Sequence, residues 1–80
     1  ERKLSFEEFN HRLEIAKQKL TPRQRELFEL NKEQGITITE IAAKALISEQ
    51  SVRNQLSQAL RVLRKELGKY ALLFSLFFIG

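Results

Sequence analysis

The helical periodicity of residues 48–67 constrains the fold more than any other feature of this sequence. Apolar side chains recur there at spacings of three and four residues and form one stripe along a helix, made of Val52, Leu56, Ala59, Leu60, Leu63 and Leu67. The opposite face is polar and carries Gln50, Arg53, Asn54, Ser57 and Arg61. Ser48 is a suitable N-cap, because its hydroxyl can accept a hydrogen bond from a first-turn backbone N–H. The pattern predicts a long helix over residues 49–67 that buries one face.

Other helices are expected on either side of this one. The first of these helices is expected over residues 5–19, with Ser5 as its N-cap. A second helix is expected to begin at Thr21-Pro22 and to end at Gly35, where glycine suits a left-handed cap. Thr39 is expected to cap a short third helix that ends near residue 45. The chain is therefore predicted to be all-α, a four- to five-helix domain.

An apolar C-terminal helix is expected over about residues 69–79. A ten-residue helix spans about 15 Å, roughly half of a bilayer's hydrocarbon core, so this segment is too short to cross a membrane. It could fold back on the domain, pair with another copy of the chain or be covered by a partner. Self-association through residues 70–79 is thus one expectation.

The short third helix and the long helix are separated only by Leu46-Ile47-Ser48. Two helices joined in this way, the second longer and polar on one side, predict a helix-turn-helix over about residues 39–67, without a wing. Ala42 is expected to face the crossing helix at close range, and Ile41, Ile47 and Val52 to fill the angle between the helices. The alternative is a helical hairpin whose polar face is only solvated. The coincidence of capping residues, small residues and a polar face favours DNA binding.

The helix-turn-helix assigns roles to its polar residues, because the N-terminal part of the second helix enters the major groove. Gln and Asn can pair with adenine, Arg with guanine, and Glu can accept from cytosine. The predicted base-reading residues are Glu49, Gln50, Ser51, Arg53 and Asn54. The predicted phosphate-binding residues are cationic or carry a hydroxyl, and they are Arg23, Arg25, Thr39, Lys44, Ser57, Arg61 and Arg64.

Cations in the first turn of a helix oppose the helix dipole, so Arg23 and Arg25 are expected to serve a function other than helix stability. An ion pair of either arginine with Glu26 or Glu29 is the structural alternative.

Composition limits the function classes. The 80 residues allow one domain and include no Cys and a single His, His11. Without a thiol, a second imidazole or a Gly-rich loop, we predict no catalytic site, no metal site and no cofactor. The 14 Lys and Arg against 10 Asp and Glu give a net charge of +4, and residues 50–69 hold Arg53, Arg61, Arg64, Lys65 and Lys69 against one acid, Glu66. This one-sided charge is typical of a phosphate-binding surface.

The ends of the chain carry two further expectations. The N-terminus is charged rather than apolar, so no signal peptide is expected and the cytoplasm is the expected location. The chain begins without Met, so it is interpreted as a fragment of a longer protein.

The run from Leu20 to Phe28, followed by Gly35, Ile41-Ala42 and Ile47-Ser48, resembles region 4 of bacterial sigma factors, especially the extracytoplasmic-function group. The end of the long helix, Ala59 to Arg64, is similar to that group's ending. The resemblance covers about residues 5–67, and the apolar tail looks like the Leu-rich ends of some such factors from Bacteroidetes. It implies binding to the −35 promoter element while the domain is tethered to the flap of RNA polymerase core. An anti-sigma protein is an implied further partner.

The residues of the motif leave alternatives open. The run from Ser48 to Asn54 also resembles the LuxR/GerE-type output domain of transcriptional regulators, which would bind DNA as a dimer. A third possibility is a helical protein-interaction module that uses the apolar tail. The chain departs from both families at Leu46, where many members have Gly in the turn. Leu46 is therefore expected to shift the turn slightly or to offer an exposed apolar contact.

Overall fold

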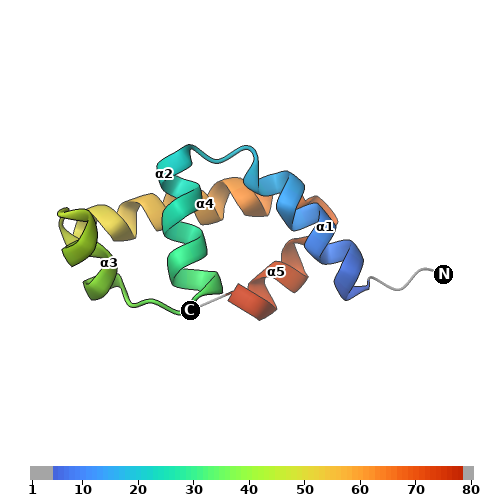
Figure 1. The fold of residues 1–80 in the computed structure, drawn as a ribbon. Helices are drawn as coiled ribbons and strands as arrows, with labels where there is room; N and C mark the ends of the chain where they lie inside the picture. The colour runs from blue at the N-terminus through green and yellow to red at the C-terminus, as the bar shows by residue number, and fades with distance from the viewer. Residues whose placement is uncertain (1–4, 79–80) are drawn as a thin grey trace.

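The computed structural model of the chain describes residues 5–78, and the side chains of residues 5–76. Every regular element in that range is helical: α1 (Phe6–Lys17), α2 (Pro22–Phe28), the π-helical turn η1 (Glu29–Glu33), α3 (Ile38–Ala45), α4 (Glu49–Leu67), the 3₁₀ turn η2 (Gly68–Tyr70) and α5 (Ala71–Phe78) (Figure 1). The all-α class with a helix-turn-helix is confirmed. Residues 1–4 of the predicted domain and the predicted helix end at residue 79 lie outside the described residues.

The helices begin where hydroxyl side chains can cap them. Ser5 Oγ accepts from the backbone N–H of Glu8 at 2.9 Å, and Ser48 Oγ accepts from that of Ser51 at 3.0 Å. At the start of α2, Thr21 and Gln24 form a reciprocal pair in which each side chain accepts from the other's backbone N–H at 3.1 Å. These caps confirm the predicted starts of α1, α2 and α4.

The predicted start of α3 is wrong. Thr37, not Thr39, is the N-cap: its hydroxyl accepts from the backbone N–H of Glu40 at 3.1 Å, and the Glu40 carboxylate accepts from the backbone N–H of Thr37 at 3.3 Å. The physical reason is the spacing of the capping box, which needs a Glu or Gln three residues after the cap. Thr37 has Glu40 at that position, whereas Thr39 has Ala42, which cannot return the hydrogen bond.

Helix α4 is the axis of an elongated molecule of 48 × 20 × 15 Å. Figure 1 shows α3 at the N-terminal end of α4, α2 crossing its middle, and α1 and α5 beside its C-terminal half. The apolar stripe of α4 forms the core with residues of the other helices, among them Phe9, Leu13, Leu27, Phe28 and Ile41. The arrangement leaves the helix-turn-helix at one end of the molecule.

The apolar C-terminal segment folds back along one side. Tyr70 and Phe74 are buried, and the Phe74 ring stacks on Phe28 with centroids 6.1 Å apart. The other side of α5 faces solvent, with Leu72 and Leu76 being 74% and 72% exposed. Among the described helices, none has the length and apolar character needed to span a bilayer.

Candidate nucleic-acid interface

The first turns of α4 present polar side chains to solvent. Val52 and Leu56 face the core and fix the rotation of the helix about its axis. The predicted base-reading residues therefore lie on the outer side: Gln50, Ser51, Arg53 and Asn54 are exposed, and Glu49 is half-buried. The structure brings this predicted set together on one end of one helix.

Two local hydrogen bonds organise these side chains. The Ser51 hydroxyl accepts from Ser48 Oγ at 3.0 Å, so Ser51 is tied to the N-cap. Gln50 Nε2 donates to Asn54 Oδ1 at 3.0 Å. This bond leaves the Gln50 carbonyl oxygen as an acceptor and the Asn54 amide as a donor. Together they match the N6 donor and N7 acceptor of adenine.

Glu49 connects the two helices of the helix-turn-helix. Its Oε2 accepts from Thr39 Oγ1 at 3.1 Å, and its Oε1 accepts from Arg53 Nη2 at 3.2 Å. Thr39, predicted as a phosphate contact, therefore lies beside the base-reading residues rather than apart from them.

The predicted phosphate contacts on α4 divide into two groups. Ser57 and Arg61 are exposed and follow Arg53 at intervals of four residues, so they continue its side of the helix. Arg64 instead has its guanidinium carbon 6.0 Å from the ring centroid of Phe74, on α5. A cation over a ring in this range makes a favourable contact, which directs Arg64 toward the C-terminal helix.

The N-terminus of α2 lies next to the middle of α4. Gln24 Nε2 donates to Gln58 Oε1 at 3.2 Å, and Gln58 adjoins Ser57. Sequence reasoning did not select Gln24 or Gln58 as site residues. The signal for Gln24 was its position three residues after Thr21, where it completes the cap; nothing in the sequence indicated its second contact.

Arg23 and Lys44 lie on a shared groove between α2 and α3. The groove has a volume of about 200 Å³ and a mostly apolar wall formed by Leu27, Leu30, Ile36, Ile41 and Ala45, with Glu26 also on its lining. The structure thus brings two predicted phosphate contacts from different helices to one surface.

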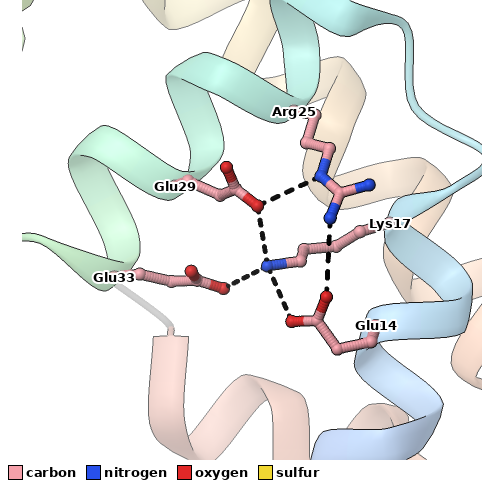
Figure 2. A network of polar contacts seen from close by, with 5 residues as sticks. All are labelled: Glu14, Lys17, Arg25, Glu29 and Glu33. Atoms are coloured by element: carbon pink, nitrogen blue, oxygen red, sulfur yellow. Dashed lines mark hydrogen bonds and ion pairs between the residues drawn. The ribbon is translucent and has the colours of Figure 1, made fainter.

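Arg25 lies elsewhere, in an ion-pair network between α1 and α2–η1 (Figure 2). Its Nε contacts Glu29 Oε2 at 3.1 Å and its Nη2 contacts Glu14 Oε1 at 3.5 Å. The same network holds Lys17, whose Nζ lies 3.0 Å from Glu14, 3.0 Å from Glu29 and 2.8 Å from Glu33. The ion pair with Glu29, which is the structural alternative expected for this arginine, is thus formed alongside the pair with Glu14.

Lys17 is 2% exposed, and it was not singled out from the sequence. Burial alone would lower the pKa of Lys17, but its hydrogen bonds to Glu33, Glu29 and Glu14 raise the pKa above its ordinary value. The hydrogen bond that Glu29 accepts from Lys17 lowers the pKa of Glu29. A signal for Lys17 existed: it falls four residues after Leu13 on the apolar stripe of α1, where a charged residue needs a partner.

Residues 5–76 contain no group of three or more His, Cys, Asp or Glu side chains arranged to hold a metal ion.

The sequence model of one protein family, described as sigma-70, region 4, matches residues 11–63. The match begins within α1, spans α2 and α3, and ends within α4, so it includes the complete turn of the helix-turn-helix. No curated protein and no solved structure matches the chain.

Proposed function

Because this chain belongs to the sigma-70 region 4 family, which binds DNA in transcription initiation, we propose that its α3–α4 unit recognises the −35 promoter element. In this proposal the unit acts within RNA polymerase holoenzyme, as part of a sigma factor of the extracytoplasmic-function group. The observation that carries the proposal is the exposed polar end of α4, at the extremity of an elongated molecule. An α-helix presented in this way can enter the major groove. The proposal implies the bacterial cytoplasm as the working compartment, since promoters are bound there.

In this proposal the base contacts come from the first turns of α4. Gln50 and Asn54 read adenine as a pair, and Arg53 reads guanine. Phosphates on either side are held by Arg61 and Ser57 of α4, and by Arg23 and Lys44 on the α2–α3 groove. Family membership favours this proposal over the LuxR/GerE-type alternative.

Arg61 provides the test of this arrangement. Substituting Arg61 by Ala is expected to weaken binding to all duplexes alike and to reduce the slope of log affinity against log salt by about one phosphate contact. The matched control is Lys32→Ala, which removes the same charge from η1. Lys32 lies at the opposite end of the α2–η1 segment from Gln24. Equal losses in both variants would show that net charge, and not this face, binds DNA.

A second, protein-binding role for α5 is favoured by the exposed pair Leu72 and Leu76. These side chains lie four residues apart on one side of the helix and are available for self-association or for an anti-sigma protein. Sedimentation of a Leu72→Ser/Leu76→Ser variant tests the first: a self-associating chain should become monomeric. An unchanged sedimentation coefficient would leave α5 without a role in self-association.

A further inference from the structure

A continuous set of hydrogen bonds links the two helices of the helix-turn-helix through Glu49. One carboxylate oxygen is bound by Thr39 of α3 and the other by Arg53 of α4. We infer that Glu49 is a positioning residue that orients the Arg53 guanidinium for base contact, and that it does not itself read a base. The inference rests on the proposed function, since it concerns how the same surface selects its DNA.

The donors available on each side chain support these roles. Thr39 has a single hydroxyl proton, and it donates that proton to Glu49. While it does so, the hydroxyl has no proton left for a phosphate oxygen, which only accepts. Arg53 has five N–H donors and uses one of them on Glu49. The remaining donors suffice for a two-bond contact with the O6 and N7 atoms of guanine.

The exposure of the pair indicates orientation rather than stability as its purpose. The side chain of Glu49 is 43% exposed and that of Arg53 is 52% exposed. An ion pair this accessible to water adds little to the free energy of unfolding. Its effect is to restrict the long Arg53 side chain before DNA arrives, which lowers the entropy lost on binding.

The negative charge of Glu49 leads to a second expectation. Its carboxylate occupies the first position of α4, where the helix dipole favours it, but where it also repels the DNA phosphates. Removing it should therefore strengthen binding to unrelated DNA while weakening discrimination between bases. A residue that reads cytosine would lose affinity for its own site instead.

The experiment compares base preferences among variants of this chain. The chain first selects its preferred sequence from a randomised pool of duplexes in the presence of RNA polymerase core. Duplexes that differ from this sequence at one base pair then compete for binding. The variants are Arg53→Ala, Glu49→Ala, the double variant, and the pair Thr39→Val and Thr39→Ser. Circular dichroism checks that each variant is folded.

The expected result is a loss of discrimination at one and the same base pair in Arg53→Ala and Glu49→Ala. The loss in Arg53→Ala should be about 5- to 150-fold, the range for a two-bond guanine contact. The double variant should lose no more than Arg53→Ala alone. Thr39→Val should lose part of the discrimination, and Thr39→Ser, which keeps the hydroxyl, should retain it.

Two results would overturn the inference, and they are distinguishable. If Glu49→Ala affects a different base pair, or adds its full loss to that of Arg53→Ala, Glu49 is a base reader and the proposed function stands. If Arg53→Ala changes no base preference, the reading surface of the proposed function is itself misplaced.

Discussion

Leu46 closes α3 in the left-handed conformation, with a φ of 59°, and its side chain is 89% exposed. The other described residues with positive φ are Gly35 and Gly68. A left-handed residue with a Cβ costs about 1–2 kcal/mol, and an exposed Leu returns little of that through packing. The expectation of an exposed apolar side chain at this position is confirmed, and the backbone keeps the left-handed cap that Gly usually supplies there.

We therefore predict that Leu46→Gly stabilises the domain by about 1 kcal/mol, because the steric cost removed exceeds the extra backbone entropy of glycine in the unfolded chain. Urea unfolding measures the change. Ala43→Gly is the matched control: Ala43 is exposed inside α3, so the same glycine there should destabilise by about 1 kcal/mol. A Leu46→Gly domain no more stable than the original would show that the turn is not strained.

The carboxylates around Lys17 make a prediction for acid stability. The pKa of Glu29 is lowered by its hydrogen bond to Lys17, so the stability contributed by its ionised form is present above its ordinary pKa of 4.5 and is lost as pH falls through the lower folded value. Glu29→Gln should therefore lose stability less steeply than the original domain below about pH 4.5. Thermal unfolding at intervals of about half a pH unit between about pH 2 and pH 6 measures the slope of stability against pH for each protein. Equal slopes would mean that Glu29 titrates alike in the folded and the unfolded state.

Among the elements, those with local signals were predictable from sequence. Ser5, Thr21 and Ser48 are hydroxyl residues ahead of amphipathic runs, and each one caps the helix that was expected. Thr37 was missed because Thr39 also precedes the apolar residues, and only the return hydrogen bond from Glu40 decides between them. The helix-turn-helix itself followed from the periodicity of α4 and its short connection to α3.

The contacts between elements were less predictable. The π-helical turn η1 had no signal in the sequence. Its residues Glu29 and Glu33 pair with Lys17 of α1, a contact between elements that local periodicity does not predict. The direction of Arg25 was undetermined for the same reason, because one of its partners, Glu14, lies on α1. Side-chain pairs such as Gln24 with Gln58 depend on how α2 crosses α4, which periodicity alone does not fix.

Helix α5 is part of the domain and not a detachable tail. Tyr70 and Phe74 are buried, so removing the chain from Tyr70 onward would also remove part of the core. We predict that Phe74→Ala destabilises the domain by about 3–5 kcal/mol, the usual range for a core Phe. Leu72→Ala on the exposed side should cost less than about 0.5 kcal/mol. Chemical denaturation distinguishes them, and equal small effects would show that α5 does not pack on Phe28 in solution.

The molecule as a whole separates its surfaces along α4. The polar end of α4 that is proposed to read DNA lies beside α3, whereas α1 and α5 lie beside the C-terminal half of α4 (Figure 1). The ion network around Lys17 joins α1 to α2–η1, and the exposed Leu72 and Leu76 are on α5. Substitutions on one surface should therefore act independently of those on the other, because residues without shared partners contribute additively. This separation permits a protein contact and a DNA contact at the same time.

The exposed end of α4 is proposed to read promoter DNA while the domain is bound to RNA polymerase. The most direct measurement immobilises this chain, adds RNA polymerase core and a pool of duplexes, and sequences the DNA retained. It compares the original chain with an Arg53→Ala/Arg61→Ala variant, both residues being exposed on α4. We predict that both chains retain polymerase and that only the original enriches one −35-like sequence. Failure to retain polymerase, or the same enriched sequence with both chains, would contradict the account.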